Sequence, residues 1–257
     1  MHTPDISVST NTRFKTLKAL LGSRGIKRHG KAFVFGTKLV PETVELFPDI
    51  IESCIIDEHH DVPGYIQDND ISTYRLKKDL FRVLDVYGTD YPLLVFATPE
   101  IPEMNDSMFG RGLALLVPFQ DPANIGAVVR SAAAFGVRDI ILLKEAALPY
   151  QPKSIRAGGT AVFQVSFSKG PSIIDIKDMP VPIVALSAGG TPLDRFAFPE
   201  SCAFLPGVEG PGMPPGIEPD HTVSIPMEAD VESLNAAVAT SIVLYEYKRR
   251  LAEQTQL

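Results

Sequence analysis

The chain has 257 residues, 45% of them hydrophobic and 21% charged, and its formal net charge is −7. These values are ordinary for a globular protein with one large or two smaller domains. The sequence lacks an apolar run of the roughly 18 to 20 residues that a membrane helix needs, and its polar start lacks the apolar core of a secretory signal. We therefore expect a soluble, cytoplasmic protein without a membrane partner.

Cys54 and Cys202 each lie in an apolar stretch, far from one another. This placement favours neither a disulfide framework nor a thiolate metal site, and we expect both side chains to be buried. The neighbouring His59 and His60 offer metal ligands, but adjacent side chains point apart. No metal site is predicted.

Helical and strand patterns alternate from the start of the chain to about residue 98. Helices are expected over residues 14–21, 39–47 and 76–85, and strands over residues 31–35, 53–57 and 91–98. This alternation predicts a small α/β sandwich as a first domain, residues 1–98.

One stretch of this first domain is basic although the whole chain is acidic. Residues 11–31 contain no acidic residue and seven basic ones, namely Arg13, Lys15, Lys18, Arg24, Lys27, Arg28 and Lys31. The negative net charge argues against a protein that coats itself with nucleic acid, whereas this patch suits a phosphate backbone. A basic run can also be an ordinary solvated helix face. Because seven basic residues without a counter-charge stand out in an acidic chain, we favour a surface that binds RNA, DNA or another polyanion.

Residues 99–110, PEIPEMNDSMFG, are rich in proline and acid and show no periodicity, which predicts a linker. Beyond it, runs that are apolar throughout recur over residues 113–117, 139–143, 161–166, 182–187, 202–206 and 222–226. Such runs fit strands that are buried on both faces of a mostly parallel sheet. A long helical pattern, residues 231–254, completes a second α/β domain, residues 111–257.

The stretch DPANIGAVVRSAAAFGV, residues 121–137, predicts a helix with Asn124 at its start and Gly136 at its end. Arg130 lies off the apolar stripe of this helix and in one column with Gly126, so its guanidinium can extend towards the carboxyl end of the preceding strand. Ligands bind at this edge in open α/β sheets. Arg130 is therefore either a ligand-binding residue or a solvent-facing arginine.

Two further motifs follow strands. Residues 205–214, LPGVEGPGMP, form a glycine-rich loop that lets backbone approach a ligand, and its spacing differs from that of the dinucleotide fingerprint. In residues 224–246 a strand ends at IPM, and Ser233 or Asn235 precedes the last helix. Taken alone, either residue is an ordinary helix cap.

The three motifs together, DPxNxGxxxRxAxxFG, GxEGxG and IPMxxxxxSLNxxxA, resemble the signature motifs of the SpoU (TrmH-type) ribose 2'-O-methyltransferases of the SPOUT superfamily. The resemblance covers residues 111–250. It implies a C-terminal α/β trefoil-knot domain with a mostly parallel sheet, and the basic first domain resembles a ribosomal-protein L30e-like substrate-binding domain. It also implies a homodimer whose active site is completed across the interface.

The resemblance further implies S-adenosylmethionine as the methyl donor and RNA as the substrate, ribosomal RNA in preference to transfer RNA, without a metal. The implied catalytic residues are Arg130, Asn124, Glu209, Ser233 and Asn235. The implied donor-binding residues and their near neighbours are Leu205, Gly207, Gly212, Ile225, Met227, Leu234 and Ala239. Guanidinium keeps its proton far above neutral pH, so we prefer an orienting and charge-stabilising role for Arg130 and leave the general-base role open.

The chain also departs from many relatives. Phe35-Gly36 stands where Glu-Gly is common, which puts the RNA contacts of the first domain in doubt, and Pro206 and Val208 replace residues that are commonly polar or small. One rival function is an RNA-binding protein of the same fold that has lost activity. A nucleotide-dependent oxidoreductase is a weaker rival, because the dinucleotide spacing is missing.

Overall fold

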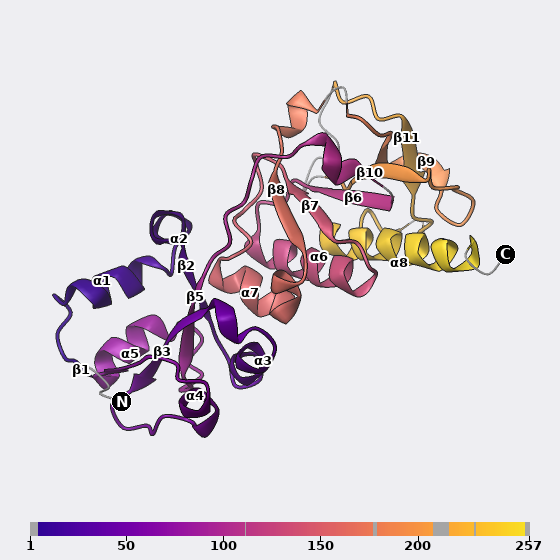
Figure 1. Ribbon diagram of the computed structural model, residues 1–257. Helices are drawn as coiled ribbons and strands as arrows, with labels where there is room; N and C mark the ends of the chain where they lie inside the picture. The colour runs from indigo at the N-terminus through magenta and orange to yellow at the C-terminus, as the bar shows by residue number, and fades with distance from the viewer. Residues whose placement is uncertain (1–4, 111, 177–178, 208–215, 229, 255–257) are drawn as a thin grey trace. The chain divides into compact units, whose positions relative to one another are not determined.

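The computed structural model describes residues 5–110, 112–176, 179–207, 216–228 and 230–254 (Figure 1). The chain divides into two compact units. The first unit comprises Met1–Glu100 and Leu148–Phe163, and the second comprises Ile101–Ala147 and Gln164–Leu257. Within the described part of the chain, no helix has the length and apolar character needed to cross a membrane.

The first unit is built on a five-stranded mixed sheet of order β1-β4-β3-β5-β2. Its strands are β1 Asp5–Ile6, β2 Lys31–Val34, β3 Ile51–Asp57, β4 Thr73–Leu76 and β5 Leu93–Ala97. Its first helices are α1 Thr12–Ala19, α2 Ser23–His29, α3 Leu39–Leu46, α4 Gly64–Asp68 and α5 Lys78–Leu84, with the 3-10 turn η1 Pro48–Ile50. The six elements expected here are confirmed, although the helix expected from residue 76 begins at Lys78 because Leu76 ends β4.

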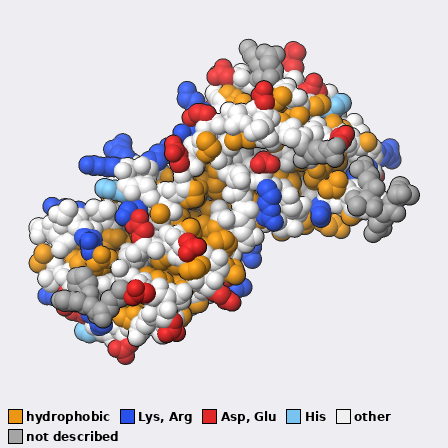
Figure 2. Space-filling model, in the orientation of Figure 1, with side chains coloured by type: hydrophobic (Ala, Val, Ile, Leu, Met, Phe, Trp, Pro, Cys, Tyr) orange, Lys and Arg blue, Asp and Glu red, His pale blue; other side chains and the backbone are white. Residues whose placement is uncertain are grey.

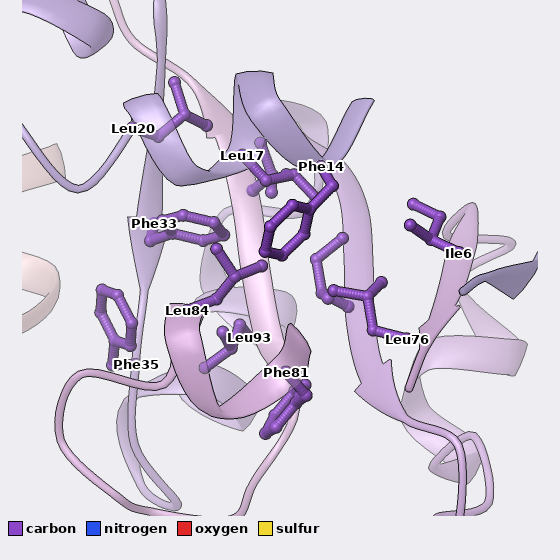
Figure 3. Close-up of a cluster of buried hydrophobic side chains, with 12 residues drawn as sticks. Ile6, Phe14, Leu17, Leu20, Phe33, Phe35, Leu76, Phe81, Leu84 and Leu93 are labelled. Carbon is purple, nitrogen blue, oxygen red and sulfur yellow. The ribbon is translucent and has the colours of Figure 1, made fainter. Parts of the chain in front are cut away.

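The core of the first unit lies between its sheet and helices α1 and α5 (Figure 3). Asn11 begins α1 by accepting hydrogen bonds from the backbone N–H groups of Arg13 and Phe14, at 2.8 and 3.3 Å. This cap fixes the helix so that Phe14 and Leu17 face the sheet and are buried. Further apolar side chains of α3, α4 and β5, such as Val40, Ile66 and Phe96, are fully buried outside this cluster.

The segment Leu148–Phe163 belongs to the first unit, although it follows β7 of the second. It forms α7 Pro152–Gly158 and the 3-10 turn η3 Gly159–Phe163. The ring of Phe96 lies 5.0 Å from that of Phe163 and 6.2 Å from that of Tyr150. The strand predicted over residues 161–166 is wrong, because Phe163 is held in a turn by these aromatic contacts and β8 starts only at Ser166.

The second unit contains a six-stranded sheet of order β11-β9-β10-β6-β7-β8 in which every pairing is parallel. Its strands are β6 Gly112–Val117, β7 Asp139–Leu142, β8 Ser166–Lys169, β9 Ile183–Pro192, β10 Ser201–Leu205 and β11 His221–Ser224. The expected α/β class with a mostly parallel sheet is confirmed.

Residues 101–110 pack on the second unit instead of forming an open connection. The backbone N–H of Met104 donates to the carbonyl of Lys169 at 2.9 Å, and Phe109, in the 3-10 turn η2 Asp106–Phe109, is buried in the apolar cluster of that unit. The prediction relied on the proline and acidic residues of this segment and overlooked the contacts of Met104 and Phe109. Glu100 ends the first stretch of the first unit and Ile101 begins the second unit, so residues 99–110, predicted as a linker, divide between the two units at this point.

Helix α6, Pro122–Ala134, begins at a different cap from the one expected. Asp121 is the N-cap, and its carboxylate accepts a hydrogen bond from the N–H of Ala123 at 3.0 Å. Asn124 instead lies in the first turn. The apolar stripe that starts at Ile125 is buried as predicted, and Gly136, at φ 83°, follows the end of the helix.

The last helix, α8 Ala236–Gln254, packs against α6 (Figure 1). The hydroxyl groups of Ser131 and Ser241 hydrogen-bond to each other at 2.7 Å between the two helices. Because this hydrogen bond ties α6 to α8, the residues at the starts of the two helices are held in a fixed relationship.

A short 3-10 turn, η4 Ile173–Asp175, follows β8.

Candidate functional site

A cavity of about 480 Å³ lies in the second unit, where residues after several parallel strands meet the starts of α6 and α8. Its described lining consists of Asn124, Leu186, Ser187, Ala188, Gly207, Ile225, Met227, Glu232, Ser233, Leu234, Asn235, Ala236 and Ala239. Gly207 follows β10 and Ile225 follows β11, so the cavity occupies the sheet edge at which open α/β folds bind ligands. Apolar walls with a few polar groups are typical of a small-molecule site.

Asn235 connects the starts of the two helices. Its side-chain oxygen accepts hydrogen bonds from the N–H groups of Ala237 and Val238, at 2.9 and 3.2 Å, and so caps α8. Its amide nitrogen donates to the side-chain oxygen of Asn124 at 3.3 Å. A single amide therefore serves both as a helix cap and as a bridge to α6, which brings two of the predicted catalytic residues together.

The predicted donor-binding residues are distributed as follows. Gly207, Ile225, Met227, Leu234 and Ala239 all line the cavity. Leu205 does not line it, because its side chain is fully buried in the apolar cluster beneath the sheet edge. Gly212 and Glu209 lie outside the described residues.

Sequence reasoning missed several lining residues. Leu186, Ser187 and Ala188 belong to β9, and Glu232 lies within the unspecified positions of the third motif. The β9 residues could have been found from the rule that ligands meet the carboxyl ends of strands, because residues 182–187 were expected to form a strand. No pattern in the sequence singles out Glu232.

Arg130 is exposed on α6 and is not among the described residues that line the cavity. It forms no hydrogen bond or ion pair with any residue in the described ranges. Val128 and Val129, which precede it and belong to the apolar stripe, are fully buried. The helix thus buries its apolar face and leaves the guanidinium exposed.

The seven basic residues of the first unit differ in their surroundings. Arg13, Lys15, Lys18, Arg24, Lys27 and Arg28 are exposed, and Lys and Arg side chains protrude from the surface over α2 (Figure 2). The guanidinium of Arg13 lies 4.0 Å from the centre of the Tyr74 ring, in a cation–π contact. Lys31 is partly buried and forms an ion pair with Glu52, so it is the weakest member of the predicted phosphate-binding surface.

Neither the cysteines nor the paired histidines form a metal centre in the described part of the chain, where no group of three or more His, Cys, Asp or Glu side chains could hold a metal ion. Cys54 and Cys202 are buried free thiols, as expected, and burial raises the pKa of each to about 12. His60 Nδ1 lies 3.9 Å from a carboxylate oxygen of the buried Asp57. The described lining of the cavity includes none of these groups.

The chain is similar to several known proteins over almost its whole length. It is 41% identical over 245 residues to "Ribosomal RNA small subunit methyltransferase G 2" of Syntrophobacter fumaroxidans, a match that covers 95% of this chain and 49% of that relative. The chain thus spans about half the length of that relative. It is 31% identical to "23S rRNA (uridine(2479)-2'-O)-methyltransferase" of Streptomyces viridochromogenes, over 94% of this chain and 91% of the relative. A third relative, "23S rRNA (guanosine(2553)-2'-O)-methyltransferase RlmP" of Bacillus subtilis, is 26% identical over 95% and 98% of the two chains.

Solved structures and a family model agree with these relatives. The crystal structure of the SpoU methyltransferase AviRb from Streptomyces viridochromogenes in complex with AdoMet matches with a TM-score of 0.77 and 26% identity, over 94% of this chain and 98% of that one. The model of the SpoU rRNA Methylase family matches residues 113–245, which include all three motifs. The chain therefore belongs to the SpoU rRNA methylase family.

Proposed function

We propose that this protein transfers a methyl group from S-adenosylmethionine to a ribose 2'-hydroxyl of ribosomal RNA. One observation carries the proposal: Asn124 of the first motif and Ser233 and Asn235 of the third line one cavity, and Asn235 donates a hydrogen bond to Asn124. These residues are more than one hundred positions apart in the sequence. Their meeting at a ligand-binding sheet edge supports a common chemical role.

The cavity suits the proposed donor. A volume of about 480 Å³ falls in the range of small-molecule sites. Leu186, Ile225 and Leu234 offer apolar walls for an adenine ring, and the hydroxyl and amide groups of Ser187 and Asn124 can meet polar parts of a ligand. Support also comes from AviRb, whose crystal structure is a complex with the cofactor AdoMet.

When bound, S-adenosylmethionine supplies a methyl group on a positively charged sulfur, which becomes a neutral thioether after transfer. Ribose hydroxyl is a weak nucleophile at neutral pH, so the protein must place its oxygen in line with the methyl carbon and assist loss of its proton. The side chains of Asn124 and Ser233 are suited to orienting that hydroxyl. Arg130 stabilises the negative charge that develops on the hydroxyl oxygen while the oxygen–methyl bond forms, the methyl–sulfur bond breaks and the hydroxyl proton passes to water; general-base action of Arg130 is the alternative.

Arg130 reaches the reaction from the partner subunit of a homodimer in this proposal. Its side chain is exposed and does not line the cavity of its own subunit. The neighbouring helix α8 also leaves the apolar side chains of Val238 and Tyr245 exposed, at 49% and 55%. A two-fold interface formed by α8 would cover these apolar side chains and would also bring Arg130 to the cavity of the partner subunit.

The first unit serves to bind the RNA. Its exposed basic residues on α1 and α2 suit a phosphate backbone, and structured RNA is commonly recognised through its shape and exposed loops. From the family resemblance we assign the ribosomal-protein L30e-like fold to the first unit and the trefoil knot to the second. The resemblance also implies a cytoplasmic location for the protein.

Ribosomal RNA of the large subunit is the preferred substrate. The two relatives of which this chain covers more than nine tenths are named for 2'-O-methylation of 23S rRNA. The name of the Syntrophobacter protein refers to the small subunit, but this chain spans only 49% of that protein. Transfer RNA is the second candidate.

The test is a methylation assay with the purified protein, labelled S-adenosylmethionine and three separate substrates: 23S rRNA, 16S rRNA and total tRNA. Methylated RNA is then hydrolysed with alkali, since a methylated 2'-oxygen cannot attack the adjacent phosphate and leaves an uncleaved dinucleotide. Label in such dinucleotides from 23S rRNA is the expected result. Donor binding without transfer to any of the three RNAs would instead favour the inactive RNA-binding protein.

A further inference from the structure

Glu232 is the only charged residue among the described residues that line the cavity. It lies in the connection between β11 and α8, directly before Ser233, and is exposed. No hydrogen bond or ion pair ties it to another part of the described chain. The described contacts therefore give the carboxylate of Glu232 no part in holding the loop in place.

The other local charges at the cavity favour anions. Asn124 lies in the first turn of α6, and Asn235 and Ala236 lie at the start of α8, so two helix N-termini face this space. The partial positive charge of a helix N-terminus attracts carboxylates and repels cations. The carboxylate of Asp121 caps α6, whereas α8 is capped by the neutral side chain of Asn235, so Glu232 is the described charge of the lining that offsets the field of α8 for a positively charged sulfur.

We propose that Glu232 is a specificity-determining residue that favours the cationic methyl donor over its neutral product. This inference rests on the proposed function, because it takes S-adenosylmethionine as the ligand. S-adenosylmethionine and S-adenosylhomocysteine share the adenosine and the amino-acid group and differ by one methyl group and one positive charge at sulfur. A carboxylate beside the cavity distinguishes the two by charge and so promotes release of the product.

The expected size of the effect follows from the exposure of Glu232. Two unit charges several ångströms apart in an exposed cavity interact far more weakly than in a dry interior, because water and salt screen them. We expect Glu232 to change the ratio of the two affinities by about 1.5- to 5-fold, in line with exposed charge pairs. The same screening predicts a smaller ratio at high salt.

The experiment measures binding by titration calorimetry with three probes in the full-length protein. S-adenosylmethionine carries the sulfonium, sinefungin carries an ammonium group in the corresponding place, and S-adenosylhomocysteine carries neither. In Glu232→Gln the affinity for the two cationic probes falls about 1.5- to 5-fold relative to the neutral one. Glu232→Lys lowers the ratio further. Glu228→Gln removes the same charge from an exposed residue outside the lining and leaves the ratio unchanged.

Two outcomes overturn the inference and are distinguishable from each other. If the wild type binds all three probes and Glu232→Gln keeps the wild-type ratio, the inference fails while the proposed function stands. If the wild type binds none of the three, the proposed function fails and the inference fails with it. Thermal unfolding of each variant shows that the protein under test is folded.

Discussion

The amide group of Asn235 donates a hydrogen bond to the side-chain oxygen of Asn124 at 3.3 Å while its own oxygen caps α8. The two atoms of one amide thus carry separate tasks. The oxygen stabilises the helix, and the nitrogen fixes the position of Asn124 in the cavity. Substitutions at this position can separate the two tasks.

Asn235→Asp keeps an oxygen that can cap α8 but replaces the donor to Asn124 with a second acceptor. We expect its thermal stability to stay close to that of the wild type and its methyl transfer to fall strongly. Asn235→Ala loses both tasks and is destabilised by about 1 kcal/mol, the usual cost of a lost cap. Equal activity loss together with equal stability loss in both variants would contradict the separation. Calorimetric unfolding and the methylation assay measure the two quantities.

Arg130→Ala is expected to lower the rate of methyl transfer by about a hundred-fold or more while donor affinity changes little, because charge stabilisation of this kind is used only during the reaction. Its exposed position in the subunit predicts the same donor affinity. Single-turnover assays and calorimetry check the two parts. Arg138→Ala, an exposed arginine in the connection between α6 and β7, is the matched control and keeps full activity.

A site shared between subunits predicts complementation. When Arg130→Ala and Asn235→Ala subunits are mixed in equal amounts and allowed to exchange, half of the dimers are mixed and each has one complete site. About a quarter of the wild-type activity is then expected, although neither variant is active alone. Absence of any recovery in a preparation shown by light scattering to contain mixed dimers would place Arg130 in the site of its own subunit.

Gly190 in β9 predicts a fourth result. A Cβ atom at this position would lie 2.6 Å from the backbone carbon of Val223 in β11, closer than real contacts allow. Gly190→Ala must therefore push the two strands apart, and we expect a loss of about 1 to 3 kcal/mol, as for other overpacked sites. The adjacent Gly189 has open space around its Cβ position, so Gly189→Ala is the control. Urea unfolding measures both, and equal stability of the two variants would refute the close approach.

Glu246 in α8 makes part of the stability depend on pH. Hydrogen bonds from Arg249, followed by those from Arg250, lower its pKa from 4.5 to about 2. The charged form is favoured in the folded state, so this stabilisation is present above pH 4.5 and is lost as the pH falls towards 2. Glu246→Gln is expected to melt lower than the wild type at pH 7 and at the same temperature near pH 2.

The control for this pH dependence is Glu253→Gln. Glu253 also pairs with Arg249, but its side chain is 63% exposed, whereas that of Glu246 is 13% exposed. Exposed pairs contribute little, so this variant should melt close to the wild type at every pH. A difference between Glu246→Gln and the wild type that stays constant from pH 7 to pH 2 would show that packing, and not charge, causes the loss. Thermal melts at several pH values provide the data.

Local patterns predicted most of the strands and helices because each has its own periodicity. The first helix of the second unit illustrates both sides: its buried stripe followed from spacing, and Pro122 marks Asp121 as the cap because proline favours the first helical position, a signal that the choice of Asn124 overlooked. The turn at Phe163, by contrast, could not be predicted. Its apolar run resembles a strand, and the aromatic partners that hold it, Phe47 and Phe96, are distant in sequence.

The residues that line the cavity were predictable only where they belong to a sequence motif. Gly207, Ile225 and Leu234 stand in motifs that a family resemblance can locate, and all three line it. Leu186 and Glu232 have no motif, because their role depends on where the strands bring them. Leu205, expected as a near neighbour of the donor, faces the core, because a leucine at a strand end can face either the core or a ligand.

The return of Leu148–Phe163 to the first unit has a consequence for biosynthesis. Phe96 and Phe47 acquire the ring of Phe163 as a neighbour, so the first hundred residues cannot complete their packing when they leave the ribosome. They must wait until β6, α6 and β7 have also been translated. Folding of the two units is thus interleaved in time, and a gene fragment cut near residue 100 would yield two pieces with unmatched aromatic surfaces.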